Sequence, residues 1–517
     1  MSTQSVFHSG RIFGGGGGGD DSNFSSCMLV DGAIISHIGH ESDQFIDSHT
    51  HLLYFGLSTL KLDLGACKNL ADIRSAISVY AAQNPNIPRI LCRGWLQSCT
   101  DGVALATTID DLDSRPIFIE SLDLHSTWCN TAALEEMGVD GSHNLRSDHL
   151  PLDENGKPTG LLAEDAMDIY TRPHLVSVCS AEDRKNALSS AFKAYQEAGY
   201  TGVMDMAMEA VTWEALVSFR EEEGIPLHLG AYWFLKPSED EEDLAKQLDV
   251  AIQMYRKWHP STSPDFCILG VKMACDGVVD GCTAYLSYAY GRMDSIVKPL
   301  WSAKAMDFVV KQASKAGLQC AIHAIGDKAI TQAVDSIAAA GCSNARHRIE
   351  HLELATAEDA QRLGELGIIA SVQPVHSDPE ILEAYETLVG KHAWERAFAY
   401  QEFAQSGATL ALGTDAPTAS HLPFPNLYTA TTRKSAMNPL SDAQLNVKNA
   451  LTLSQAIVAA SQGAAYSRFA EEWTGTLKSG LRADFLVVDT VWRPEKLLEA
   501  RLLSTWARGR KIADMVL

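Results

Sequence analysis

The sequence predicts an α/β protein whose main domain is a (β/α)8 barrel of the TIM type, and three observations support this prediction. The chain has 517 residues, of which 46% are apolar, so it can bury a large core. From residue 200 onwards, short apolar segments typical of buried strands alternate with helical segments. One earlier apolar segment brings the number of strands to eight, as in such a barrel. A doubly wound open sheet is the alternative fold.

The eight predicted strands are short and apolar. They cover residues 45–52, 201–206, 228–235, 267–274, 318–325, 347–352, 367–374 and 408–414. Helices are expected between them, for example over residues 303–316, 327–340 and 357–366. Gly317 and Gly367 stand where two of these helices would end, just before a strand begins.

Residues 53–199 have a mixed pattern and form an insertion after the first strand. Its predicted helices cover residues 70–82, 127–137 and 181–199, and its predicted strands cover residues 89–96 and 116–123. Residues 140–160 are polar and rich in turn residues, so we expect them to run over the surface.

Both ends of the chain contain short strands, predicted over residues 6–13, 27–30, 33–38, 483–489, 504–508 and 511–517. We expect residues 1–44 and 466–517 to join into one small β-sandwich, which leaves residues 45–465 as the barrel domain. The glycine run at 14–19 is predicted to be a flexible loop. It lacks the Gly-Lys-Ser/Thr ending of a phosphate-binding loop.

Composition argues against several classes of partner. A net charge of −23 disfavours binding to a phosphate backbone. No apolar stretch reaches the ~18–20 residues of a membrane helix, and the first eleven residues lack the pattern of a secretory signal. Eleven cysteines without CxxC pairs are typical of reduced thiols. We therefore expect a cytoplasmic protein with no nucleic-acid or membrane partner, and a homodimer is left open.

Six side chains of metal-ligand type fall at or near the ends of five predicted barrel strands, where active sites of such barrels lie. They are His49, His51, Lys272, His323, His351 and Asp415. His49 and His51 share one face of the first strand, because alternate side chains of a strand point the same way. Each residue alone has an ordinary explanation, such as a core histidine or a helix cap, but a buried lysine is rare unless it is paired. The set as a whole predicts a metal centre.

The motifs that contain these residues are Phe45-Ile46-Asp47-Ser48-His49-Thr50-His51, Val271-Lys272 with Asp276-Gly277, His323-Ala324-Ile325-Gly326-Asp327, Ile349-Glu350-His351 and Gly413-Thr414-Asp415-Ala416-Pro417. Together they resemble the amidohydrolase superfamily. Within it, the chain looks most similar to the YtcJ-like, amidohydrolase-3 branch, which includes N-substituted formamide deformylases. The resemblance covers nearly the whole chain. The chain departs from the family pattern just before Phe45. Relatives have a longer stretch between the N-terminal strands and the first barrel strand, so the small sandwich is expected to be incomplete.

The resemblance implies two divalent metal ions. His49, His51 and Asp415 would bind the first ion, and His323 and His351 the second. Lys272 would bridge both ions after carboxylation of its amine. A carbamate is an anionic oxygen ligand, whereas an ammonium group is repelled by a cation. Zinc is the first choice for this ligand set, with iron, manganese or nickel as alternatives.

The resemblance also implies a hydrolase that cleaves a C–N bond, of amide or formamide type, in a small organic molecule. A metal-activated hydroxide would attack the carbonyl carbon, while Asp415 accepts the water proton and passes it to the leaving nitrogen. His125 would hydrogen-bond to the substrate or the developing oxyanion, unless it is a structural histidine of the insertion. Trp95, Trp128 and Glu164 would shape the substrate pocket.

Three other functions are compatible with the same scaffold. A metal-dependent decarboxylase or other lyase needs the same ligands, and only its products would distinguish it. A mononuclear hydrolytic deaminase is disfavoured because a bridging carbamate on Lys272 implies two ions. A non-catalytic binding protein is disfavoured because all six ligands are present.

Overall fold

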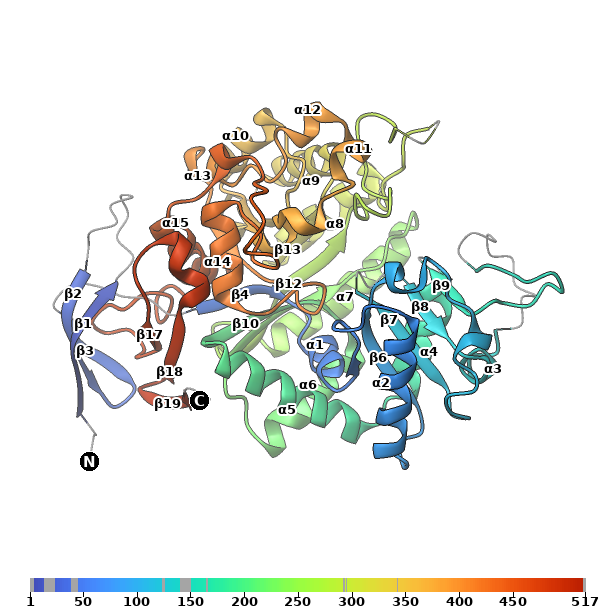
Figure 1. Ribbon diagram of the computed structural model, residues 1–517. Helices are drawn as coiled ribbons and strands as arrows, with labels where there is room; N and C mark the ends of the chain where they lie inside the picture. Colours follow the sequence, from blue (N-terminus) through green and yellow to red (C-terminus); the bar gives the residue numbers. More distant parts are fainter. Residues whose placement is uncertain are drawn as a thin grey trace. The chain divides into compact units, whose positions relative to one another are not determined.

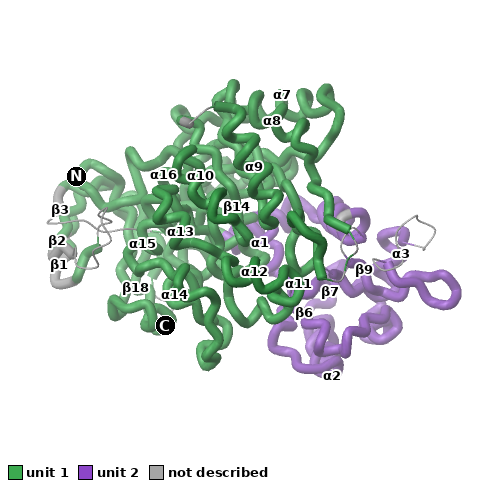
Figure 2. The backbone as a smooth tube through the Cα atoms, turned by 90° about the horizontal axis from the view of Figure 1, so that it is seen from above, with its two compact units in different colours: residues 1–52, 192–517 green, residues 53–191 purple. Residues whose placement is uncertain are grey.

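The computed structural model of the protein describes residues 4–13, 24–38, 45–122, 126–139, 150–163, 166–291, 293, 295–341 and 343–514. The predicted glycine loop at 14–19 lies outside these residues, as does the first part (140–149) of the predicted surface segment 140–160. The chain divides into two compact units, residues 1–52 with 192–517 and residues 53–191 (Figure 2). The predicted boundaries between the barrel domain and the small β-sandwich stay a prediction.

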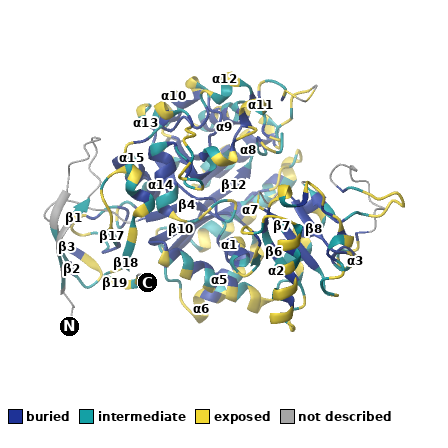
Figure 3. Ribbon diagram, in the orientation of Figure 1, coloured by how far each residue is buried: buried dark blue, intermediate teal, exposed yellow. Residues whose placement is uncertain are grey.

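The first unit contains an eight-stranded parallel sheet whose strands follow one another in chain order (Figure 1). The strands are β4 (Phe45–Thr50), β10 (Tyr200–Met208), β11 (His228–Phe234), β12 (Phe266–Ala274), β13 (Gln319–Ala324), β14 (Arg348–His351), β15 (Ile369–Val372) and β16 (Leu410–Leu412). Each overlaps one of the eight predicted strands, so the predicted (β/α)8 barrel is confirmed. Nearly all their residues are buried, as expected for parallel strands covered on both faces (Figure 3).

The barrel closes between its first and last strands. The carbonyl oxygen of His49 accepts hydrogen bonds from the backbone N–H groups of Thr414 (3.2 Å) and Asp415 (2.7 Å). Gly413 permits this approach, because a Cβ at its position would lie 2.5 Å from the backbone nitrogen of His49. The closure therefore places the end of β16 beside the end of β4.

The helices that follow the strands have clear start and stop signals. Those of the barrel and its loops are α6 (Ala210–Glu222), α7 (Glu241–Lys257), α8 (Ala303–Lys315), α9 (Asp327–Ala340), α10 (Ala357–Leu366), α11 (Tyr385–Val389), α12 (Lys391–Trp394), α13 (Tyr400–Gln405), α14 (Pro423–Thr432), α15 (Leu453–Val458) and α16 (Ala464–Ser467). In α10 the Thr356 hydroxyl caps the first turn, and Gly367 ends the helix at φ +64°. No helix in the described part of the chain is long and apolar enough to cross a membrane.

The second unit contains its own mixed five-stranded sheet. Its strands are β5 (Leu62–Asp63), β6 (Ile90–Trp95), β7 (Ile117–Ser121), β8 (Ser126–Cys129) and β9 (Leu161–Ala163), with helices α2 (Leu70–Gln83), α3 (Thr131–Met137) and α4 (Arg172–Val178). Helices α1 (Leu52–Thr59) and α5 (Ala181–Glu197) stand at its two ends in the sequence.

The predicted helix over residues 127–137 is wrong in its first residues. Thr127, Trp128 and Cys129 belong to strand β8, and the helix starts after Asn130. The Asn130 side chain accepts a hydrogen bond from the backbone N–H of Ala133, which caps the helix. Thr127 is β-branched and Trp128 is aromatic, and such residues favour a strand. The strand therefore continues up to Cys129, and the helix begins only after the cap residue Asn130.

Both ends of the chain meet in one small antiparallel structure beside the barrel strands. The N-terminal sheet contains β1 (Gln4–Phe13), β2 (Phe24–Asp31) and β3 (Ile34–Ile38), and the C-terminal sheet contains β17 (Phe485–Asp489), β18 (Arg501–Ala507) and β19 (Arg510–Asp514). Ile35 donates a backbone hydrogen bond to Leu481, and Ala483 donates one to Ala33. Both sheets contribute to one apolar core of Met28, Val30, Ile35, Leu477, Ala483 and Phe485. The predicted sandwich built from both termini is therefore confirmed.

Candidate metal centre

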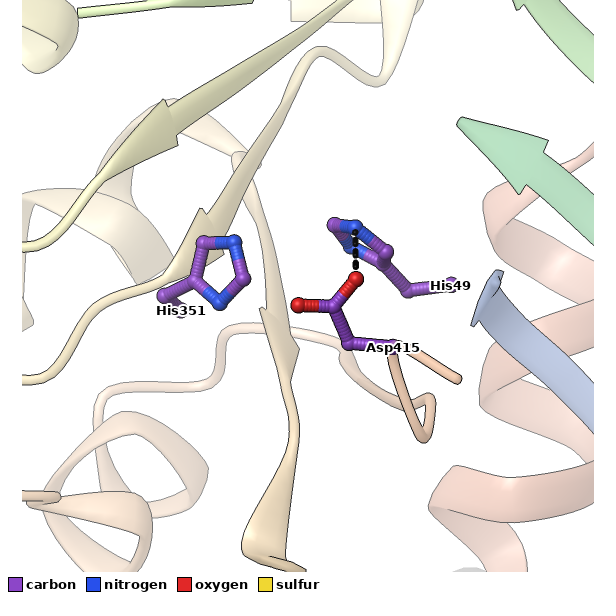
Figure 4. Close-up of side chains that lie close together, drawn as sticks. All are labelled: His49, His351 and Asp415. Atoms are coloured by element: carbon purple, nitrogen blue, oxygen red, sulfur yellow. Dashed lines mark ion pairs between the residues drawn. The ribbon is translucent and has the colours of Figure 1, made fainter. Parts of the chain in front are cut away.

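Four of the predicted ligands converge at the carboxyl-terminal ends of strands β4, β14 and β16. His49 Nε2 and His51 Nε2 lie 3.3 and 3.1 Å from Oδ1 of Asp415. His49, His351 and Asp415 each offer a ligand atom, and these three atoms lie within 4.8 Å of one another (Figure 4). The His323 ring is close to this group, with its centroid 4.5 Å from that of His351.

Asp415 provides a permanent negative charge at this position. Burial alone would raise its pKa, but the charges of His49 and His51 and their hydrogen bonds hold the pKa well below its usual value. Thr414, which precedes Asp415, is held by Asp47. The Asp47 carboxylate accepts hydrogen bonds from the hydroxyl (2.6 Å) and the N–H (3.0 Å) of Thr414. The carboxylate is therefore anionic at neutral pH and held beside strand β4.

His49 is oriented by a buried ion pair. Its Nδ1 lies 2.6 Å from Oε2 of Glu350, and Arg348 binds both oxygens of that carboxylate, with Nε 2.5 Å from Oε1. Burial would raise the pKa of Glu350, but the charge of Arg348 lowers it well below its usual value. A carboxylate on Nδ1 keeps the proton there and leaves the lone pair of Nε2 for a metal ion.

Neither Arg348 nor Glu350 is among the ligands or catalytic residues predicted from the sequence. Both are fully buried charged residues that alternate with apolar ones in strand β14. This alternation places them on one face of the strand, which was the available signal.

His51 and His323 each have one ring nitrogen engaged. Nδ1 of His51 lies 2.8 Å from the carbonyl oxygen of Met206, and Nε2 of His323 lies 3.1 Å from that of Gly277. A ring N–H donates in each case, so in the neutral ring the opposite nitrogen is the one that can bind a cation. Nδ1 of His351 is buried and has no hydrogen-bond partner among the described residues. These nitrogens fit a divalent cation, which would supply the missing contact.

Burial keeps two of these imidazoles in the neutral form that binds metals. Burial and the charge of Lys272 lower the pKa of His323 to about 4. Burial, together with the neighbouring His323, lowers the pKa of His351 well below its usual value. Both rings are therefore neutral at pH 7.

Lys272 lies in strand β12 with only 5% of its surface exposed. Burial lowers the pKa of its amine to about 8, although the charges of Glu350 and Asp415 oppose this shift. Its amine makes no hydrogen bond or ion pair to a neighbour in the described ranges. A neutral amine is the form that reacts with carbon dioxide, and the lowered pKa increases the share of that form.

Two further side chains, His376 and Glu353, lie at the same end of the barrel and are not among the predicted site residues. His376 stands on the short turn η5 (Pro374–Ser377) after β15, and its ring stacks on that of His351 at 5.7 Å and 7°. Its Nε2 lies 3.8 Å from Oδ2 of Asp415. Glu353 is 7% exposed and accepts a hydrogen bond from the hydroxyl of Tyr385. The predicted seventh strand had no assigned ligand, and a histidine two residues after its predicted end was the available signal.

Several strand ends at this site adopt the left-handed backbone region. The φ angles are +58° at Ala207, +72° at His351, +55° at Leu352 and +60° at Asp415. Such conformations cost non-glycine residues about 1–3 kcal/mol each and cluster at functional sites. They direct the chain so that ligands from different strands face one another.

The predicted residues of the insertion belong to the second unit. Trp95 and Trp128 are fully buried in its core, with ring centroids 5.4 Å apart, and the indole N–H of Trp128 donates to the carbonyl oxygen of Leu105. His125 and Glu164 lie outside the described residues. A role in catalysis or substrate binding stays a prediction for all four residues.

Comparison with known proteins identifies the family. A model of the amidohydrolase family (Amidohydro_3) matches residues 45–513, more than half of the chain. The chain belongs to the amidohydrolase family. The expected amidohydrolase-3 branch is thereby confirmed, and the protein is an enzyme, an amidohydrolase that acts on carbon–nitrogen bonds. The match begins at Phe45, where strand β4 starts.

Three relatives are similar to this amidohydrolase over most of their length. Protein LONG AFTER FAR-RED 3 of Arabidopsis thaliana is 28% identical, over 90% of this chain and 81% of its own. YtcJ of Bacillus subtilis is 26% identical, over 86% and 83%. The N-substituted formamide deformylase of Arthrobacter pascens is 24% identical, over 90% and 86%.

A solved structure supports the fold of this amidohydrolase. It is an uncharacterized metal-dependent hydrolase from Pyrococcus horikoshii, with a TM-score of 0.75 and 21% identity, covering 93% of this chain and 96% of its own. The likeness covers nearly the whole length of both chains, so the two proteins share the fold.

Proposed function

We propose that this amidohydrolase uses two divalent metal ions to hydrolyse an amide or formamide C–N bond in a small organic molecule. The observation that carries the proposal is the convergence of His49, His351 and Asp415 at the barrel end, with ligand atoms within 4.8 Å of one another. The similarity to the N-substituted formamide deformylase of Arthrobacter pascens supports the choice of substrate class.

The ligands divide between two ion positions in this proposal. His49, His51 and Asp415 hold one ion, and His323 and His351 hold the other. Lys272, carboxylated on its amine, bridges them. Imidazole nitrogens with carboxylate and carbamate oxygens suit zinc first. When bound, the ions polarise the substrate carbonyl and lower the pKa of a water molecule.

The side chain of Asp415 accepts and returns the proton of the attacking water. Asp415 is ionised, and its Oδ1 faces His49 and His51, so Oδ2 is the oxygen that accepts the proton of the attacking water. The same oxygen returns the proton to the nitrogen as the C–N bond breaks. Water adds its hydroxyl to the carbonyl carbon and its proton to the nitrogen, so an N-substituted formamide yields formate and an amine.

Buried hydrogen bonds around the ligands keep this geometry constant during the reaction. Arg348 and Glu350 hold His49, and Asp47 holds Thr414 next to Asp415. These contacts are buried, so reorientation by solvent is excluded.

The test is product analysis on protein loaded with Zn²⁺. N-substituted formamides and simple N-acyl amines are supplied as substrates, and free amine with formate or carboxylate is quantified against metal-depleted protein. Release of both products only from the metal-loaded protein supports the proposal. Release of carbon dioxide without an amine would indicate a lyase instead. Absence of amine release with zinc, iron, manganese and nickel would contradict the proposal.

A further inference from the structure

A second group of metal-ligand side chains lies at the mouth of the barrel. His351, Glu353 and His376 each offer a ligand atom, and these atoms lie within 4.8 Å of one another. The proposed hydrolysis uses His351 but assigns no role to the other two. The three residues come from the end of β14, the loop after it and turn η5.

The chemistry of this group suits a divalent cation. Two imidazoles and one carboxylate form a common protein ligand set for zinc. His351 and Glu353 are 5% and 7% exposed, and the His376 side chain is 17% exposed. The imidazole of His351 has two ring nitrogens, and its buried Nδ1 has no hydrogen-bond partner in the part of the chain that the structure describes. One nitrogen can bind this cation while the other serves the two-ion centre.

No cationic side chain in the described ranges is paired with Glu353. It forms no ion pair with a lysine or arginine among the described residues. A bound cation would supply the positive charge that this buried carboxyl group lacks.

Glu353 is held in place before any ion binds. The hydroxyl of Tyr385 donates to its carboxylate, and the backbone N–H of Phe398 donates to its carbonyl oxygen at 2.7 Å. Leu352 precedes it at φ +55°, which lets both His351 and Glu353 contribute to one group.

His376 is held by a separate connection to the last barrel strand. The side chain of Asn426 accepts a hydrogen bond from the N–H of Val375 and donates one to the carbonyl oxygen of Gly413, both at 2.9 Å. Asn426 is 4% exposed. It therefore ties the turn that carries His376 to the segment that carries Asp415.

We propose that His351, Glu353 and His376 together bind one divalent cation at this end of the barrel. The family resemblance places ions only on His49, His51, Lys272, His323, His351 and Asp415, so the site on Glu353 and His376 is additional to that assignment. The proposal concerns the position of an ion and goes beyond the proposed function. It stands whichever bond the enzyme cleaves.

The direct test is a crystal structure of the unaltered protein loaded with Zn²⁺ alone, with data collected at the zinc absorption edge. We expect an anomalous peak within bonding distance of ligand atoms from His351, Glu353 and His376. Anomalous peaks confined to the other predicted ligands would overturn the proposal.

A second test measures zinc content after dialysis. The variants Glu353→Gln and His376→Asn are each expected to contain one equivalent of zinc fewer per chain than the unaltered protein. Glu383→Gln and His392→Asn serve as matched controls, because Glu383 is exposed before helix α11 and His392 is exposed in helix α12. Unchanged zinc content in Glu353→Gln and His376→Asn would contradict the proposal. The measurement does not use turnover, so its result is separate from that of the hydrolase test.

Discussion

Nδ1 of His49 lies 2.6 Å from Oε2 of Glu350, although the two residues are 301 positions apart in the sequence. The contact joins the first and sixth strands of the barrel, and both side chains are almost fully buried. It fixes the tautomer of His49 and so the direction of its Nε2 lone pair. Metal binding by strand β4 therefore depends on a carboxylate supplied by strand β14.

Replacing this carboxylate should weaken metal binding. In Glu350→Gln the side-chain shape is kept, but the charge that orients His49 is lost. We expect zinc affinity to fall by about 10–100-fold, as for other partners of metal-bound histidines. Competition with a zinc chelator measures the change. Glu358→Gln, on the exposed start of α10, is the control. Equal affinities in both variants would contradict this role of Glu350.

Removing the base should abolish turnover while most of the metal stays bound. Asp415→Asn cannot accept a proton at Oδ2, so we expect kcat to fall by roughly 10²–10⁴-fold. Steady-state kinetics and zinc analysis are measured on the same preparation. A variant that keeps its zinc and more than a tenth of its kcat would show that Asp415 is not the base.

Lys272→Arg tests the proposed carbamate. Arginine keeps a positive charge but cannot be carboxylated, since its guanidinium is never deprotonated at neutral pH. We expect loss of turnover and of one zinc equivalent per chain. ¹³C NMR after incubation with labelled bicarbonate should show a carbamate signal in the unaltered protein only. An unaltered protein without that signal, or a variant with full zinc content, would count against the bridging role.

The stability of the metal-free protein should decrease at mildly acidic pH, in part because of His347. Its ring accepts a hydrogen bond from the N–H of Cys320, and burial lowers its pKa to about 4. The unfolded chain binds a proton near pH 6.5, whereas the folded one does so only near pH 4. The stability associated with the neutral ring is therefore complete above pH 6.5 and is lost as pH falls towards 4, by roughly 3 kcal/mol.

Urea unfolding at several pH values measures this dependence. His347→Gln can still accept the hydrogen bond but does not titrate. We expect the variant to lose less unfolding free energy than the unaltered protein between pH 6.5 and 4. Parallel curves for both proteins would show that His347 does not contribute.

The sequence alone determined the barrel. Its eight strands are buried on both faces, so each appears as a short apolar run that contrasts with the amphipathic helices beside it. The candidate ligands could also be proposed from sequence, because histidine, lysine and aspartate at the ends of such runs lie on one side of a parallel barrel. The start of α3 was the exception, where Asn130 as a cap was a better guide than the extent of the segment.

Only the tertiary structure decided which side chains meet. The pairing of Glu350 with His49, and the grouping of Glu353 and His376 with His351, join residues from different strands and loops. Residue patterns along one segment report its own period and burial, but not the side chain that faces it from another strand. Closure of the barrel between His49 and Asp415 sets those distances, and with them the predicted metal positions.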